Sequence, residues 1–220
     1  MDYVTYELSK DEKISCIAKV GQNSTPVWRQ IRWDTGDYAS YIVHNGCGHC
    51  CATMALRLHG INVNPHEEYE LCRALWGAPN ESGNPIQQHF MSISGISKIM
   101  EHFHIPAKCY GVPKEKLEET KEIILSALSA GKQVVFWSQP SPDFPENPFS
   151  KGAHYVMAIG FLSSGQIAVA NSNEKMAPQG VQGVDWATIE KALYHGSEPT
   201  DMTWGESERY KHCAGYVVIG

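Results

Sequence analysis

Apolar residues in the middle of the chain recur with a helical period, and the breaks between them predict four helices. The second of these begins with a proline that has acidic residues behind it, an arrangement typical of the first turn of a helix. The fourth is closed by a glycine, the residue that most often follows a helix end. The expected helices are Gly48 to Leu58, Pro65 to Trp76, Ser92 to Phe103 and Lys114 to Ala130.

Further along, the pattern changes to short apolar runs rich in β-branched and aromatic residues, which predict strands. One amphipathic helix, Asp185 to Tyr194, interrupts them. A proline-rich loop, Gln139 to Ala153, separates two of the strands, and loops of this length often line a functional site. The expected strands are Gln133 to Trp137, His154 to Phe161, Gln166 to Ala170 and Gly215 to Ile219.

Helices first and strands afterwards predict an α+β fold, in which a helical lobe packs on a largely antiparallel β-sheet. We expect a single domain over residues 1–220. Its first part, to about residue 130, would be mainly helical with short strands near the N-terminus, of which Lys13–Val20 is the clearest. Its second part, from about residue 131, would form the sheet lobe.

Composition and charge exclude several classes of partner. The chain is 42% hydrophobic and 19% charged, with a net charge of -6 and no run of lysines or arginines. A nucleic-acid-binding protein needs a basic face to displace counterions, so we expect no nucleic-acid partner, and the same charge argues against an anionic membrane surface. No apolar stretch is long enough to span a bilayer.

The first residues and the cysteines predict a cytoplasmic protein. The N-terminal residues MDYVTYELSK have neither the basic nor the apolar region of a signal peptide. The seven cysteines are odd in number and lie in otherwise apolar stretches, which favours reduced thiols over a disulfide framework.

The segment from His44 to Cys51 contains the densest chemistry in the sequence. Cys47 lies between two glycines and just before a run of good helix formers, so its sulfur is expected at a helix N-terminus. There the helix dipole and unpaired backbone amides favour the thiolate and lower its pKa, which suits a nucleophile. A backbone amide at the same turn is also available to stabilise an oxyanion.

Three alternatives compete for this segment. Cys47-Gly48-His49-Cys50 has the letters of a thiol–disulfide redox motif, although it lacks the preceding buried strand of such proteins. A zinc site using Cys47, Cys50, Cys51 or His49 is the weakest alternative, because no second pair of ligands follows at comparable spacing. Cys50 and Cys51 are otherwise expected to be small core residues.

A histidine and an asparagine in the second half complete a nucleophilic site. His154 begins one apolar strand, and Asn171 ends the strand that returns after the turn at Ser163-Ser164-Gly165. In an antiparallel hairpin, the first residue of one strand lies near the last residue of the other. We therefore expect His154 as the general base and Asn171 as the group that orients its imidazole.

This order of cysteine, histidine and asparagine is that of the papain fold, and the local sequence resembles the bacteriocin-leader (double-glycine) peptidase-like family. The resemblance rests on the Gly46-Cys47-Gly48 turn running into Ala52-Thr53-Met54-Ala55, and on the apolar strand from His154 to Gly160. It extends from about Trp28 to the last strand. Where that family has Asp-Pro, this chain has Asn171-Ser172, and an asparagine at this position is also found in papain.

The resemblance also implies a glutamine that completes the oxyanion hole. Six residues before Cys47, where papain-like enzymes have it, this chain has Tyr41. Gln30 stands in the element Gln30-Ile31-Arg32-Trp33, which is similar to a more distant Gln-x-x-Trp element of some family members, and Asn45 is the other candidate.

We therefore expect a papain-like cysteine peptidase or amidase, of bacterial type by resemblance, that forms a thioester acyl-enzyme with Cys47. Water, or an amine or thiol acceptor, would resolve the acyl-enzyme. The resemblance implies a peptide or small amide substrate and no cofactor or metal. The alternatives are a thiol–disulfide oxidoreductase and a non-catalytic papain-fold binding module, and the sequence leaves the oligomeric state open. We see no ATP-transporter segment in this sequence, so we do not expect export coupled to leader cleavage from this chain alone.

Overall fold

The structure of the protein is a computed structural model that describes eight parts of the chain. These are residues 5–6, 46–76, 92–112, 114–140, 144–173, 175–178, 180–193 and 215–220. The predicted strand Lys13–Val20 lies outside them.

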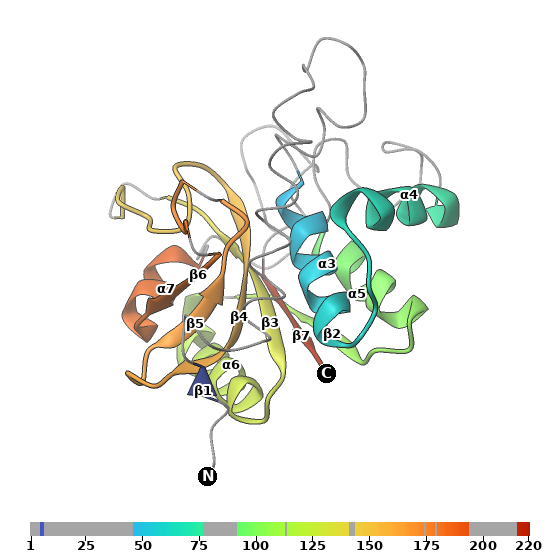
Figure 1. The fold of residues 1–220 in the computed structure, drawn as a ribbon. Coiled ribbons are helices and arrows are strands. Elements are labelled where there is room, and N and C mark those ends of the chain that lie inside the picture. The colour runs from blue at the N-terminus through green and yellow to red at the C-terminus, as the bar shows by residue number, and fades with distance from the viewer. Residues whose placement is uncertain are drawn as a thin grey trace.

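Three helices lie on one side of the sheet; the first and third pack against its strands, and the second packs on the first (Figure 1). They are α3 (Cys47–Leu58), α4 (Pro65–Trp76) and α5 (Ile93–His102). Local capping explains two of their starts. Before α4, the Asn64 side chain accepts from the Glu67 amide at 2.9 Å and the Glu67 carboxylate accepts from the Asn64 amide at 2.8 Å. At α5, Ser92 Oγ accepts from the Gly95 amide at 3.0 Å.

The sheet is antiparallel between all neighbours of its main path, whose order is β2-β7-β3-β4-β5-β6. A short strand, β1 (Thr5–Tyr6), pairs in parallel with the far end of β4. The strands of the main path are β2 (Ala107–Tyr110), β7 (Tyr216–Ile219), β3 (Gln133–Ser138), β4 (His154–Leu162), β5 (Ile167–Ala170) and β6 (Val181–Val184).

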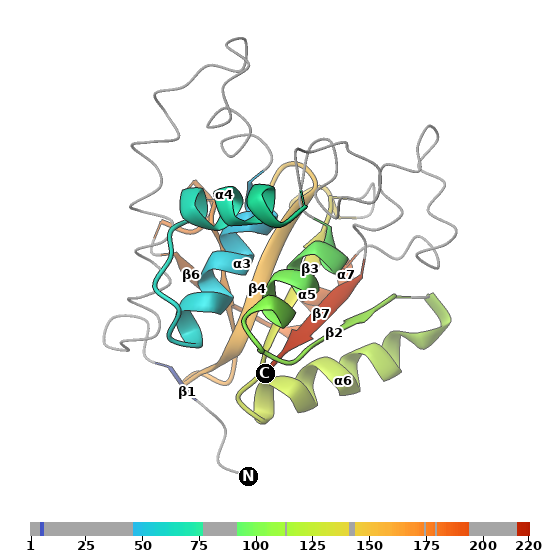
Figure 2. The same ribbon diagram turned by 90° about the vertical axis from the view of Figure 1, so that its right-hand side faces the viewer.

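Two hydrophobic cores lie on opposite faces of this sheet. Tyr155 and Met157 of β4 point into the core shared with α3 and α5, whereas Val156 points into the second core. That second core is closed by α6 (Leu117–Ser129), preceded by the short 3-10 helix Lys114–Lys116, and by α7 (Trp186–Ala192) (Figure 2). Because β4 is buried on both faces, its sequence is continuously apolar instead of alternating.

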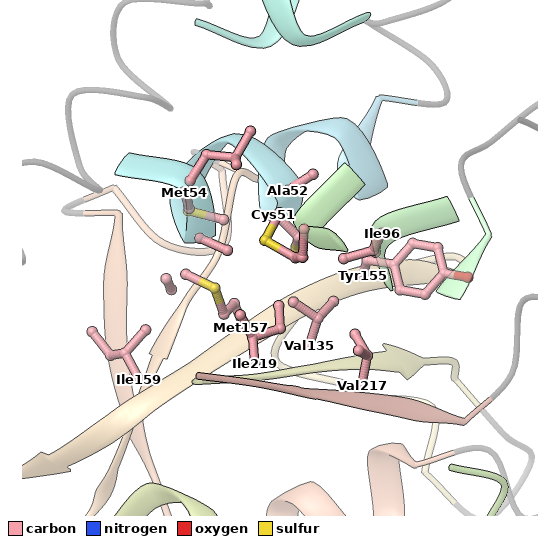
Figure 3. Close-up of a cluster of buried hydrophobic side chains, with 14 of the residues drawn as sticks. Cys51, Ala52, Met54, Ile96, Val135, Tyr155, Met157, Ile159, Val217 and Ile219 are labelled. Carbon is pink, nitrogen blue, oxygen red and sulfur yellow. The ribbon is translucent and has the colours of Figure 1, made fainter. Parts of the chain in front are cut away.

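The first core joins α3 directly to the central strands. Figure 3 shows Cys51, Ala52 and Met54 of α3 above Val135, Met157, Val217 and Ile219 of the sheet. Each of these side chains is at most 1% exposed. Close packing of this kind fixes the helix against β4, so the N-terminus of α3 has a defined position relative to the start of that strand.

The α+β fold predicted from the sequence is confirmed, and its arrangement is consistent with a papain-like fold. The helix and strand boundaries differ from the predicted ones by at most three residues. Two strands of the main path, β2 and β6, were not predicted. The fourth predicted helix, α6, lies on the face of the sheet opposite α3 and α5. Within the described ranges, no helix is long and apolar enough to cross a membrane.

Candidate active site

Cys47 is the first residue of α3. Gly46 precedes it as the N-cap without a side-chain cap, and its carbonyl accepts the first helical hydrogen bond from the Cys50 amide at 2.8 Å. The first turn carries no acidic residue, so the backbone amides at this end of the helix are not engaged by a local carboxylate. The cysteine is partly exposed and packs against the core that contains Tyr155 of β4.

Burial raises the pKa of the Cys47 thiol, and backbone hydrogen bonds from Tyr155, Gly48 and Cys47 itself oppose that rise. The helix position alone predicts a lowered pKa, so this expectation is wrong in direction. Desolvation of the thiolate outweighs the amides that stabilise it. The hydrogen bond from the Tyr155 backbone also places the Cys47 sulfur next to the residue that follows His154.

His154 begins β4 and is hydrogen-bonded to Asn171, with Nε2 and Oδ1 2.8 Å apart. The pairing of β4 with β5 brings Ala170 opposite Met157, so Asn171 follows at the same sheet edge as His154. Burial lowers the pKa of His154 to about 4, although the hydrogen bond to Asn171 raises it. The imidazole is therefore neutral near pH 7 and available as a base.

The Asn171 amide has hydrogen bonds in all four of its donor and acceptor directions. Its Oδ1 accepts from His154 and from the Asn173 amide, the latter at 2.9 Å. Its Nδ2 donates to the Phe149 carbonyl at 3.0 Å and to Gln182 Oε1 at 3.1 Å. Because an amide oxygen can only accept, the proton between the two side chains belongs to His154 Nε2. The other ring nitrogen, Nδ1, is left without its proton and free to take one from a thiol.

The remaining candidate residues lie either outside the described part of the chain or in the core. Gln30, Tyr41 and Asn45 lie outside the described residues. Cys51 is fully buried in the first core. Cys50 is also fully buried, and burial raises the pKa of its thiol despite a hydrogen bond with Ser172.

The hypothesis of a zinc site at the cysteine cluster finds no support in the described part of the chain. There, the group with suitable ligand atoms is His49, Glu68 and Cys72, which includes His49 of that hypothesis but none of the three clustered cysteines. His49 Nδ1 lies 2.6 Å from Glu68 Oε2, and the Cys72 thiol donates to Glu68 Oε1 at 3.1 Å. The carboxylate thus has a protein partner at each oxygen.

Sequence reasoning missed this buried group. The spacing of Glu68 and Cys72 by four residues puts both on one face of α4, but polar residues at such spacing usually face solvent. Both of them, and His49, are fully buried.

A family of peptidases matches most of the chain. The model of the Peptidase_C39 like family matches residues 22–200. The chain belongs to this family of cysteine peptidases. No curated protein matches the chain. The resemblance inferred from the glycine-flanked cysteine and the histidine strand is therefore confirmed at the level of the family, and family membership points to peptide substrates.

Proposed function

We propose that this member of the Peptidase_C39 like family hydrolyses peptide or small amide bonds with Cys47 as nucleophile, His154 as general base and Asn171 as its orienting group. The observation that carries the proposal is the hydrogen bond between His154 Nε2 and Asn171 Oδ1 at 2.8 Å. It leaves the Nδ1 lone pair as the basic site of the ring. The Cys47 sulfur accepts a hydrogen bond from the Tyr155 backbone and so lies beside the start of β4, where His154 is.

The mechanism starts from a neutral thiol and a neutral imidazole. As the Cys47 sulfur attacks the substrate carbonyl carbon, its proton moves to His154 Nδ1, and the carbonyl oxygen becomes an oxyanion. The backbone amide of Cys47, together with Gln30, is proposed to stabilise that oxyanion. His154 then gives the proton to the leaving amine, and a thioester remains on Cys47. Water, activated by His154, cleaves the thioester and restores the thiol, and an amine acceptor would give acyl transfer instead.

A reducing compartment suits this chemistry. The five cysteines in the described part of the chain are free thiols. A catalytic thiol must stay reduced to act as a nucleophile, so we propose that the protein works where disulfides do not form, as in the cytoplasm.

Selective alkylation tests the proposed nucleophile. Cys109 is the exposed thiol among the described cysteines, whereas Cys47 is only partly exposed. If exposure alone governed the rate, a limiting amount of iodoacetamide would modify Cys109 first. We expect Cys47 to react first, because His154 takes its proton as the sulfur is alkylated, and to lose this advantage in His154→Ala. Because the pKa of Cys47 is raised, its alkylation should be more rapid at about pH 8 than at about pH 6. Peptide mapping by mass spectrometry identifies the modified residue.

The matched control is Cys109→Ser, which removes the exposed thiol and should leave the alkylation of Cys47 unchanged. Equal, slow modification of all thiols in the native protein would contradict a nucleophilic role for Cys47. Hydrolysis of a peptide library by wild type, with none by Cys47→Ala, then tests turnover itself.

One observation favours a second candidate, a non-catalytic module that keeps the fold. The raised pKa of Cys47 reduces the thiolate fraction below that of an ordinary cysteine. Such a module would bind peptides from the same library without cleaving them. The redox alternative is disfavoured by the same finding, because burial raises the pKa of both Cys47 and Cys50.

A further inference from the structure

The amide of Gln182, on β6, stands between Asn171 and the loop before β4. Its Oε1 accepts from Asn171 Nδ2 at 3.1 Å, and its Nε2 donates to the Pro148 carbonyl at 3.3 Å. A carbonyl oxygen can only accept, so Pro148 determines which end of the Gln182 amide faces it. The other end, the oxygen, must then face Asn171.

The loop that supplies this carbonyl is itself held in place. Phe149 is fully buried and packs edge to face on Phe136, with ring centroids 5.8 Å apart. Its amide donates to Asn147 Oδ1 at 2.9 Å, and Asn147 Nδ2 donates to Ser138 Oγ at 2.8 Å. Ser138 is the residue paired with His154 across β3 and β4. The network therefore starts and ends at the strand position of His154, and the carbonyls of Pro148 and Phe149 have fixed positions.

A rotation of the Asn171 amide by half a turn would reverse every one of its hydrogen bonds. Its NH₂ group would then face the His154 Nε2 proton and the Asn173 amide, so that donors would meet donors. Its oxygen would face the Phe149 carbonyl and Gln182 Oε1, so that acceptors would meet acceptors. Gln182 thus adds one of the two bonds that oppose the flipped orientation on the Nδ2 side.

We infer that Gln182 is a positioning residue of the active site. It holds the Asn171 carboxamide in the one orientation that keeps the proton on His154 Nε2 and leaves Nδ1 free for the Cys47 proton. It acts through Asn171 and not on the substrate. The role rests on the proposed function, but the orientation that it maintains is a property of the folded protein and can be measured without any substrate.

The tautomer of His154 is the direct readout. In full-length protein with ¹⁵N-labelled histidine, long-range ¹H–¹⁵N spectra distinguish a ring protonated at Nε2 from one that exchanges between tautomers, and His154→Gln assigns the signal. Wild type is expected to show the Nε2 tautomer at neutral pH. Gln182→Met keeps the length of the side chain but removes both hydrogen bonds, and it should shift His154 towards a mixture of tautomers.

The matched control is Gln166→Met, which makes the same change at an exposed glutamine before β5, where Nε2 reaches the Gly183 carbonyl at 3.5 Å. It should leave the His154 spectrum unchanged. A His154 spectrum that is the same in wild type, Gln182→Met and Gln166→Met would overturn the inference.

The rate of Cys47 alkylation separates this inference from the proposed function. If both hold, Gln182→Met lowers the rate roughly three- to tenfold, as expected for one neutral hydrogen bond, and Gln166→Met does not. If Cys47 shows no selective alkylation even in wild type, the proposed function fails, and the tautomer still decides whether Gln182 orients Asn171. If Cys47 is alkylated selectively and Gln182→Met reacts at the wild-type rate, the positioning role alone is overturned.

Discussion

Acidification is expected to destabilise the folded protein through the imidazole of His154. In the folded protein burial lowers the pKa of His154 to about 4, against 6.5 for an ordinary histidine. The unfolded chain therefore takes up the proton first as the pH falls. The contribution of the neutral ring to stability is complete above about pH 6.5 and is lost progressively as the pH falls towards about 4. Since one pKa unit corresponds to about 1.4 kcal/mol, the loss reaches about 2.5 kcal/mol at about pH 4.5.

His154→Gln isolates this effect, because glutamine has no charge to gain and its amide can still donate to Asn171. Urea unfolding of wild type and variant at several pH values gives the difference in their free energies of unfolding, in which the titration of all other groups cancels. We expect wild type to lose stability relative to the variant by about 2.5 kcal/mol between about pH 7.5 and about pH 4.5.

A difference between wild type and His154→Gln that stays constant with pH would refute the reasoning. His154 would then bind its proton equally well in both states, and burial would not be what keeps the ring neutral.

Three further predictions concern single substitutions, and a fourth substitution serves as a control. Asn171→Ala removes the acceptor of His154 Nε2 and should lower kcat/KM for peptide hydrolysis roughly 10- to 100-fold. Glu68→Gln replaces a carboxylate that is fully buried and hydrogen-bonded at both oxygens. It should lower the free energy of unfolding, measured in urea, by about 3 kcal/mol. Glu70→Gln, which breaks only an exposed pair at 3.5 Å, should cost less than about 1 kcal/mol. Gly215→Ala should lower the melting temperature through a loss of at least about 2 kcal/mol, because φ is +107° and the new Cβ would clash with the Tyr110 carbonyl oxygen.

The features that the sequence predicted correctly are those set by local pattern. The helix period and the proline at its start define Pro65–Trp76 to the residue. The hairpin of β4 and β5 follows from two apolar runs and the short turn between them, and it brings His154 and Asn171 together without any long-range information.

The features that escaped prediction depend on contacts between distant segments. β6 is short and is defined mainly by its pairing with β5, so neither the strand nor the position of Gln182 was evident. The carbonyls of Pro148 and Phe149 carry no signal in the side-chain sequence, although they orient two amides. The predicted direction of the Cys47 pKa shift was wrong for a related reason. The helix terminus can be predicted from local sequence, whereas burial depends on distant segments.

Burial acts on both partners of the proposed catalytic pair in the same sense, since it disfavours the thiolate of Cys47 and the imidazolium of His154. With the pKa of the Cys47 thiol raised by burial and that of His154 lowered to about 4, moving the proton from sulfur to nitrogen is unfavourable for separated charges. The proton is therefore expected to stay on Cys47 until the sulfur attacks a carbonyl, when the oxyanion and the forming bond replace the thiolate charge. The Asn171 and Gln182 amides contribute to this step by keeping the ring proton on Nε2, so that Nδ1 is unprotonated when the sulfur attacks.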